Sequence, residues 1–396
     1  MAVPSLASLL RDALLLVLML LALAAPAAAQ PAKALAPIPA ATLALMTAKS
    51  TSAAASVLFR AYKKESEIEV WKKAASGRFV HVKTYPICRW SGQLGPKRKT
   101  GDRQTPEGFY TVARSQLNPN SSYYLSFDVG YPNAYDRAHG YTGSAVMVHG
   151  VCSSMGCFAM TDAVAGELYA IAREAFDGGQ AAFQFQSFPF RMNAANMARH
   201  RTDPEYAFWR QLKEGSDRFE ATGEEPVVGV ADRRYVFAPS KDPRRELEVV
   251  SRRAEEDKRI AALIAEGSAA IRTTYSDGGQ HPFWAAFAAR GGSVGIVSRP
   301  EALAYAGQEV VVIPARRAPV QVAEAVWSRW IAGSVALARW NIATFVPSYE
   351  RPLAAFPPLV VAYAETLPRI VSETIAERVP PLLSLPPKAP DILAQR

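Results

Sequence analysis

Cysteine is scarce in this chain of 396 residues, which contains three. Three cysteines are too few for the disulfide framework of a small secreted scaffold, and their odd number leaves at least one thiol unpaired. The five histidines show no zinc-finger spacing with the cysteines. Charged residues are also few, at 20% against 49% hydrophobic residues, a composition that permits a packed globular core.

The charge that is present is unbalanced, with a formal net charge of +9 at pH 7. A basic protein favours anionic partners such as nucleic acid, a membrane surface or an acidic polymer. The sequence contains neither the aromatic motifs of RNA-binding modules nor the pattern of a DNA-recognition helix. We therefore expect no nucleic-acid partner.

The N-terminus has the pattern of a secretory signal peptide over residues 1–29. Arg11 precedes an apolar run over residues 14–25, and a run of small residues ends at Ala29, which is the order of regions in a cleaved signal. The alternative is an uncleaved membrane anchor. Because the apolar run is shorter than the about 20 residues that a spanning helix needs, we expect cleavage after Ala29.

The stretch from Val146 to Asp162 has the residues of a nucleophilic site. An apolar run suited to a buried strand ends at His149, and a loop of small and polar residues then leads to Cys157. The thiolate is the reactive form of cysteine, and a neighbouring imidazole can generate and hold it. The pattern predicts Cys157 as nucleophile and His149 as its base.

Three further residues of this loop are predicted to support the reaction. Gly150 and Gly156 let the backbone come close, so that amide N–H groups can point at a developing oxyanion. Ser154 is expected to orient a neighbour through a hydrogen bond. Residues 163–176 have helical spacing and end at Gly178, which would place the loop near a helix N-terminus that favours a thiolate.

This stretch resembles the signature of the L,D-transpeptidase (YkuD-type) catalytic domain family, in which His-Gly is followed by Ser-x-Gly-Cys. The similarity extends to the YafK-type branch of murein L,D-transpeptidase-like proteins. Five more segments carry it, at residues 84–92, 101–110, 118–124, 130–140 and 188–192. The resemblance implies an α+β fold with a mainly β catalytic core and flanking helices over residues 57–240.

The resemblance also implies a reaction. A cysteine enzyme of this family acts on the L-centre of diaminopimelate in peptidoglycan, through a thioester on Cys157, without a metal or an organic cofactor. Its partners are peptidoglycan and its peptide stems, in the periplasm. Within the YafK-type branch the implied outcome is hydrolytic, either release of peptidoglycan-attached lipoprotein or trimming of the peptide.

The sequence departs from the wider family at two positions. Members commonly have His before the Gly-Cys pair and Arg two residues after the Cys, where this chain has Met155 and Ala159. The loss of that Arg removes a planar fork for a substrate carboxylate. We therefore expect hydrolysis, with formation of diaminopimelate cross-links or protein attachments by an L,D-transpeptidase as the alternative.

Several residues outside the loop are candidates for substrate binding or support. They are Tyr123, Tyr124, Arg137 and Arg103 for binding substrate, and His139 as a second active-site imidazole. The structural alternative is that the aromatic residues pack within their own loop and that the basic residues are solvated.

The rest of the chain is predicted from composition. Residues 30–56 are rich in Ala and Pro and are expected to form a linker, whereas residues 241–346 begin with a charged amphipathic helix and are expected to form a helical extension. Residues 347–396 hold ten of the 29 prolines and are expected to be a partly disordered tail.

Three readings compete with the enzyme. His149, Cys152 and Cys157 offer three metal ligands, although structural zinc takes four. A Cys152–Cys157 disulfide would silence the nucleophile in an oxidising compartment. A non-catalytic cell-wall-binding protein would not need Cys157 at all.

Overall fold

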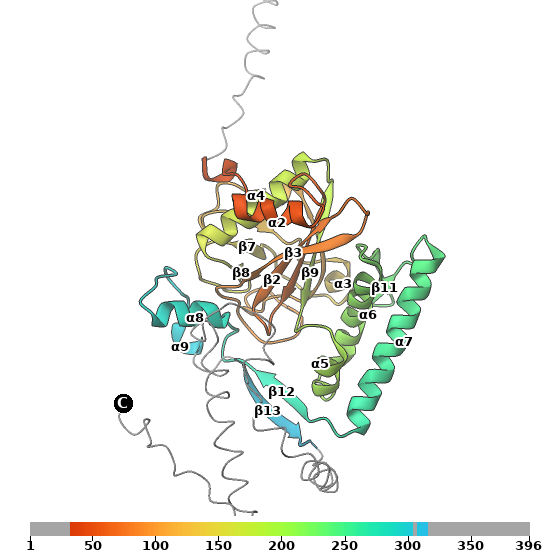
Figure 1. Ribbon diagram of the computed structural model, residues 1–396. Coiled ribbons are helices and arrows are strands. Elements are labelled where there is room, and N and C mark those ends of the chain that lie inside the picture. The colour runs from red at the N-terminus through yellow and green to blue at the C-terminus, as the bar shows by residue number, and fades with distance from the viewer. Residues whose placement is uncertain (1–31, 304–306, 316–396) are drawn as a thin grey trace, which may run out of the picture. The chain divides into compact units, whose positions relative to one another are not determined.

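The computed structural model describes residues 32–303 and 307–315, which form an α+β fold built on two β-sheets (Figure 1). The first sheet has the strand order β3-β2-β1-β9-β4 and the second β5-β6-β7-β8. The strands are β1 (Val57–Tyr62), β2 (Glu67–Lys73), β3 (Phe79–Pro86), β4 (Gly108–Ala113), β5 (Leu117–Asn118), β6 (Ser126–Asp128), β7 (Met147–His149), β8 (Phe158–Ala159) and β9 (Ala182–Phe188). The predicted class, a mainly β core with flanking helices, is confirmed.

The first sheet begins with a hairpin, as alternating polar and apolar residues indicate. β2 pairs antiparallel with β3. β1 lies inside the sheet, because it pairs antiparallel with β2 and parallel with β9. All six residues of β1 are buried, as expected for a strand that is covered on both faces.

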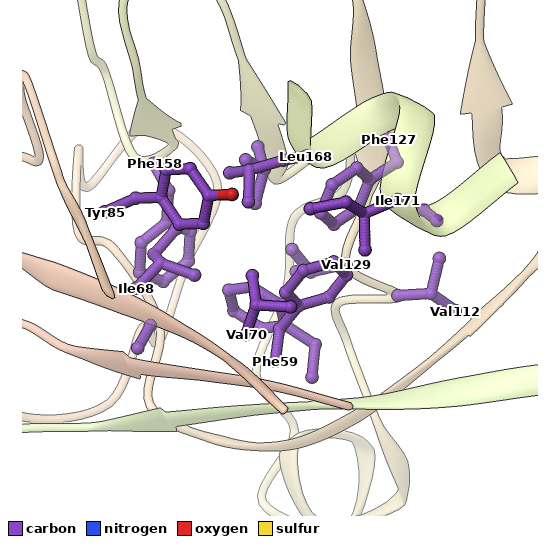
Figure 2. Close-up of a cluster of buried hydrophobic side chains, with 14 of the residues drawn as sticks. Phe59, Ile68, Val70, Tyr85, Val112, Phe127, Val129, Phe158, Leu168 and Ile171 are labelled. Carbon is purple, nitrogen blue, oxygen red and sulfur yellow. The ribbon is translucent and has the colours of Figure 1, made fainter. Parts of the chain in front are cut away.

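Apolar side chains from both sheets meet in the main hydrophobic core, together with helix α4 (Asp162–Asp177). Figure 2 shows Phe59 and Val70 of the first sheet, Phe127 of the second, and Leu168 and Ile171 of α4 in one cluster. Full burial of such a side chain contributes about 1.5–3 kcal/mol. The core therefore anchors β7, β8 and α4, which flank the predicted nucleophile loop.

Four helices and a hairpin pack around a second core, which Trp209 and Leu212 share with Phe109 and Phe188 of the first sheet. These elements are α3 (Ala134–Ala138), α5 (Ala194–Arg199), α6 (Tyr206–Thr222), β10 (Val228–Ala231), β11 (Arg234–Phe237) and α7 (Pro243–Ala265). The short helix η2 (Arg114–Gln116) lies between β4 and β5 in sequence. α7 is the charged amphipathic helix that the sequence predicts.

Part of the predicted linker over residues 30–56 is structured. It contains η1 (Ala32–Leu35) and α2 (Ala40–Ala48), and Ala34 and Met46 are buried. Lys83 of β3 donates to both Thr42 of α2 and Glu167 of α4. The prediction was wrong because alanine is the best helix former and the Ala-rich stretch has tertiary contacts.

The predicted helical extension also contains strands. β12 (Ala270–Thr274) and β13 (Gln308–Ile313) form a two-stranded antiparallel sheet, and α9 (Pro300–Leu303) lies between them in sequence. α8 (Pro282–Ala289) belongs to a separate compact unit, in which the rings of Phe283 and Phe287 stack.

The expected signal peptide over residues 1–29, the part of the extension after residue 315 and the tail over 347–396 lie outside the described residues. Within the described ranges, no helix has the length and apolar character needed to cross a membrane.

Candidate active site

Strands β7 and β8 bring the predicted nucleophile and base to one face of the second sheet. They pair in parallel, with Val148 opposite Phe158 and His149 opposite Ala159. Alternate side chains of a strand point to opposite faces. Because Val148 and Phe158 point into the main core, His149 and Cys157 both point to the other face.

Cys157 is the one free cysteine. Its Sγ accepts a hydrogen bond from the Met147 amide at 3.4 Å and lies 3.7 Å from the Ala145 carbonyl oxygen. Burial raises the pKa of the Cys157 thiol; the Met147 amide and the Lys97 ammonium lower this pKa, while the Asp128 carboxylate raises it. The resting thiol is therefore protonated at neutral pH, so the nucleophile needs a base.

His149 has the properties of that base. Its side chain is buried, and its Nδ1 faces the Gly150 carbonyl oxygen at hydrogen-bond distance. Because a carbonyl only accepts, Nδ1 carries the proton and Nε2 keeps its lone pair. Burial lowers the pKa of His149, so the imidazole is neutral at pH 7. Among the described residues no hydrogen bond joins His149 to Cys157, and the Tyr123 ring lies 4.8 Å from the imidazole.

Ser154 holds the loop that carries the thiol. Its buried Oγ accepts from the amides of Gly156 at 3.2 Å and Cys157 at 3.1 Å, and it donates to the Cys157 carbonyl at 2.8 Å. Thr105 Oγ1 donates to the same carbonyl at 3.3 Å. The predicted supporting role of Ser154 thus takes the form of fixing the backbone on both sides of Cys157.

These contacts do not favour the predicted oxyanion site. The amides of Gly156 and Cys157 already donate to Ser154, and the Gly150 amide donates to the Tyr123 carbonyl at 3.0 Å. An amide that is directed at an internal acceptor does not point at a substrate carbonyl. Gly150 is instead required for space, since a Cβ there would lie 2.5 Å from Asp162 Oδ1.

The structure does not place the thiol at a helix N-terminus, where a dipole effect was expected. α4 begins beyond β8, with Thr161 as its N-cap, and a dipole acts mainly within the first turn. Asp162, in the first turn of α4, accepts a hydrogen bond from the Val151 amide at 2.8 Å. Because burial dominates, the pKa of the Cys157 thiol is raised and not lowered.

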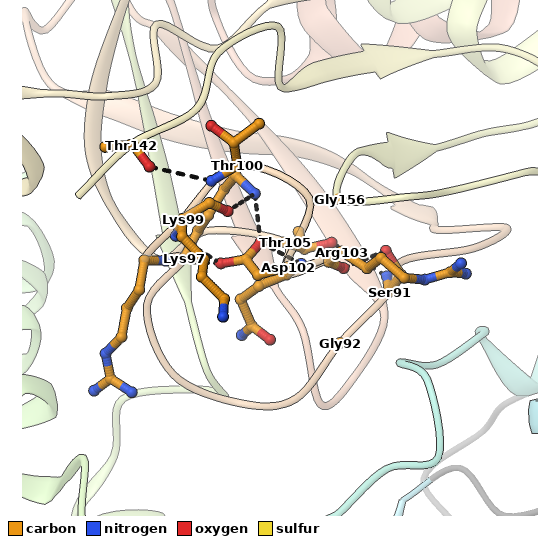
Figure 3. Close-up of polar contacts among 12 residues, drawn as sticks. Ser91, Gly92, Lys97, Lys99, Thr100, Asp102, Arg103, Thr105, Thr142 and Gly156 are labelled. Carbon is orange, nitrogen blue, oxygen red and sulfur yellow. Dashed lines mark hydrogen bonds and ion pairs between the residues drawn. The ribbon is translucent and has the colours of Figure 1, made fainter.

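We call residues 150–157, between β7 and β8, the thiol loop. A polar loop over residues 91–105 packs beside it (Figure 3). Ser91 Oγ donates to the Arg103 carbonyl at 2.7 Å and lies 3.1 Å from Ser154 Oγ. Gly156 has φ of +123°, and a Cβ there would lie 3.4 Å from the Gln104 carbonyl oxygen. The two loops therefore lie in contact, and the positive φ of Gly156 is what requires glycine there, because a Cβ would make only ordinary contact with Gln104.

A disulfide joins Cys88 to Cys152, and it corrects two of the alternatives that the sequence left open. Cys152 does not pair with Cys157. The metal reading fails as well, since a disulfide sulfur is not the thiolate that a metal binds. The bond ties the start of the polar loop to the thiol loop across 64 residues of sequence.

The other predicted residues lie in two places. Tyr124 and the backbone of Arg103 adjoin the thiol loop, since a Cβ built at Gly150 would lie 2.9 Å from Tyr124 Cβ and one built at Gly156 would lie 3.8 Å from the Arg103 carbonyl carbon. The Arg103 side chain donates to Asp277 at 2.8 Å. His139 ends α3, where it contacts Tyr135.

Arg137 donates to the Pro132 carbonyl and lines a cavity of about 470 Å³ beside Tyr135 and Tyr235. His139 and Arg137 thus contact the α3 region and not the thiol, so neither is an active-site residue in this structure.

Sequence reasoning missed Asp128, Ser298 and Asp277. Asp128 pairs with Met147 across β6 and β7, which puts its side chain on the face that carries Cys157; the strand alternation of residues 126–128 could have indicated this. Ser298 bonds the backbone of Ser154, 144 residues away, and no local pattern announces such a contact.

Comparison with known proteins identifies the family. A model described as the L,D-transpeptidase catalytic domain, YkuD, matches residues 51–178. Over 182 residues the chain is 44% identical to the Escherichia coli K12 protein "Putative L,D-transpeptidase YafK", covering 46% of this chain and 74% of that protein. The protein of the same name from E. coli O157:H7 gives the same values. The chain belongs to the YkuD L,D-transpeptidase family.

Two solved structures are similar at low TM-score. The helical cell shape determining protein Pgp2 from Campylobacter jejuni has 14% identity and a TM-score of 0.27, over 59% of this chain and 80% of that chain. Bd1075 from Bdellovibrio bacteriovorus has 13% identity and a TM-score of 0.24, over 57% of this chain and 77% of that chain. Neither likeness is close enough to carry an argument.

Proposed function

We propose that this chain is an exported, periplasmic enzyme that hydrolyses peptide or lipoprotein linkages at the L-centre of diaminopimelate in peptidoglycan. The observation that carries the proposal is the pairing of β7 with β8, which puts the only free thiol on the same sheet face as a neutral, buried imidazole. The family supplies the substrate class.

The first half-reaction forms a thioester. Nε2 of His149 takes the proton from Cys157 Sγ, and the thiolate adds to the carbonyl carbon of the L-centre. The tetrahedral intermediate collapses by breaking the C–N bond, and the leaving nitrogen takes the proton from His149. For the proton transfer, the thiol and imidazole must come into hydrogen-bond contact, which catalytic pairs often make only with substrate bound.

The second half-reaction decides the product. If water adds to the thioester after giving a proton to His149, collapse restores the thiol and leaves a carboxylic acid. If an amine adds, the product is a cross-link or a protein attachment. Ala159 favours hydrolysis, because it is buried in β8 and supplies no guanidinium for the carboxylate of a donor or acceptor stem.

Mass spectrometry of peptidoglycan treated with the purified protein tests the proposal. The substrates are sacculi that carry attached lipoprotein and free tetrapeptide muropeptides, with Cys157→Ala as the matched control. The assay contains no reductant, because reduction would open the Cys88–Cys152 disulfide and not release the nucleophile.

Each outcome has a distinct meaning. Released lipoprotein or shortened peptides from the intact protein alone would support the hydrolase. New diaminopimelate–diaminopimelate cross-links would show that the protein is a transpeptidase and not a hydrolase. Identical products from both proteins, with equal binding to sacculi, would overturn the enzyme in favour of a cell-wall-binding protein.

A further inference from the structure

A segment of the extension, beyond the span that the family model matches, packs on the thiol loop. We name residues 275–281 and 294–303 the docking segment; both stretches belong to the same compact unit as the two sheets. Ser298 Oγ accepts from the Ser154 amide at 2.9 Å and donates to the Ser154 carbonyl at 3.3 Å. One hydroxyl from the docking segment therefore holds both backbone polar groups of Ser154.

Ser154 transmits this contact to the nucleophile. Its Oγ holds the amides of Gly156 and Cys157 and the carbonyl of Cys157. A change in the position of the Ser154 backbone would move the acceptor on which both amides depend. The path from Ser298 to the backbone of Cys157 consists of hydrogen bonds between buried or half-buried groups.

A second path runs through Arg89, whose side chain is fully buried. Its backbone pairs with Ala159 of β8, at N···O distances of 2.9 and 3.0 Å. Its Nε donates to the Ser298 carbonyl at 3.2 Å. Arg89 thus joins the docking segment to the strand that follows Cys157.

Asp277 is the carboxylate that three guanidinium groups share at this junction. Its carboxylate lies 2.8 Å from Arg103, 3.2 Å from Arg299 and 3.5 Å from Arg89. Three guanidinium groups around a buried carboxylate would repel one another without it. Asp277 therefore binds the polar loop, the strand partner of β8 and the docking segment together.

Glycines make the close approach possible. Gly279 and Trp90 exchange backbone hydrogen bonds of 3.0 and 3.1 Å. At Gly278, which has φ of +77°, a Cβ would lie 2.0 Å from the Trp90 carbonyl oxygen. Glycine at these two positions therefore lets the docking segment turn directly against the backbone of Trp90.

We infer that the docking segment positions the thiol loop, with Ser298 and Asp277 as its positioning residues. The inference rests on the proposed function only in taking Cys157 as the nucleophile. Loss of the Ser298 hydroxyl leaves the Ser154 amide and carbonyl without partners. The loop then departs more often from its resting geometry, which exposes the thiol and weakens its alignment with His149.

The test uses the full, oxidised chain with Ser298→Ala, Ser298→Thr, Asp277→Asn and Ser276→Ala. Ser276 is an exposed serine of the same segment and serves as the matched control. The rate of iodoacetamide alkylation of Cys157, the one free thiol, is followed by intact mass between pH 7 and pH 10. Thermal unfolding and peptidoglycan turnover are measured beside it.

We expect Ser298→Ala and Asp277→Asn to raise the alkylation rate roughly tenfold, the effect of about one hydrogen bond, and to reduce turnover. Ser298→Thr keeps the hydroxyl and should lie within about twofold of the wild type, as should Ser276→Ala. Wild-type alkylation rates in both Ser298→Ala and Asp277→Asn would overturn the inference, even if their unfolding temperatures fell. If the wild type turns over no peptidoglycan, the proposed function fails, whereas alkylation still decides the positioning role.

Discussion

The thiol of Cys157 lies in surroundings that suppress its reactivity until a base acts. Burial withdraws solvent from the thiolate, and Asp128 adds a negative charge on the same sheet face. Because the thiolate is the form that is oxidised or alkylated, surroundings that disfavour the thiolate protect Cys157 from both reactions. The cost is that the reaction depends on His149 and on the alignment of the loop.

The contribution of Asp128 can be measured by substitution. In Asp128→Asn the carboxylate charge is lost, so the thiolate becomes easier to form. We expect the pKa of Cys157 to fall, so that alkylation at pH 8 is faster than in the wild type. Asp177→Asn, at the exposed end of α4, is the control. An unchanged or slower rate in Asp128→Asn would contradict the assigned geometry.

The pH–rate profile should report the buried imidazole. A base must be unprotonated to act, and burial lowers the pKa of His149 from its ordinary value of 6.5. His149 therefore stays competent as the pH falls below 6.5, and we expect the acid limb of kcat/KM to have its midpoint below that value. His149→Gln should reduce turnover by about 10²–10⁴-fold. A midpoint above pH 6.5 would show that another group controls the limb.

At the scale of elements, the Cys88–Cys152 disulfide links the chain after β3 to the loop before β8. It closes a loop with a sequence separation of 64 residues, for which chain entropy gives about 4 kcal/mol of stability. We expect Cys88→Ser/Cys152→Ser to lose about 2–5 kcal/mol in denaturant unfolding. Cys157→Ser, which leaves the disulfide intact, should lose far less. Alkylation of three thiols in the denatured, unreduced wild type would disprove the bond.

Local elements were the predictable part of this fold. The β2–β3 hairpin and helix α4 follow from alternation, helical spacing and Gly178. The motif likewise indicated a shared site for His149 and Cys157, which the register of β7 and β8 puts on one face. The periodicity of apolar residues is a local property of the sequence. It therefore predicts a helix or strand correctly where the tertiary packing agrees with the local preference of the segment.

What the sequence did not reveal depends on distant partners. Three cysteines allow three pairings, and only the fold brings Cys88 to Cys152. The Gly156 amide points at Ser154 because of the backbone conformation of Gly156. The residue types alone do not show this direction, so the sequence could not exclude this amide as an oxyanion donor. The contact from Ser298 to Ser154 joins segments that the chain order separates by the whole α4–α7 region.

At the scale of the whole molecule, stability in acid should depend on a histidine far from the candidate site. His200 is fully buried between α5 and α6, stacks on Phe190 at 4.5 Å, and has no hydrogen-bond partner among the described residues for either ring nitrogen. Burial, then the nearby Lys64 and Arg199, lower the pKa of His200 to about 4, opposed by Glu309.

The consequence for folding has a definite sign. Below pH 6.5 the unfolded chain binds a proton at His200 that the folded chain does not bind, so the free energy of unfolding falls as the pH falls, until pH 4 is reached. At pH 4.5 the loss is about 2 kcal/mol. His200→Phe keeps the stacked ring and removes the titration.

We therefore expect wild type and His200→Phe to have similar free energies of unfolding at pH 7, whereas at pH 4.5 the variant should be more stable by about 2 kcal/mol. Denaturant unfolding at both pH values measures this difference. Burial raises the pKa of Asp136 to about 7 and that of Asp217 to about 6. Both carboxyl groups titrate in the same way in the two proteins, so their contributions cancel in the difference between the two free energies of unfolding. An equal loss of stability in both would mean that His200 is hydrated or paired, so that its packing against Phe190 and Trp209 would differ from the arrangement described.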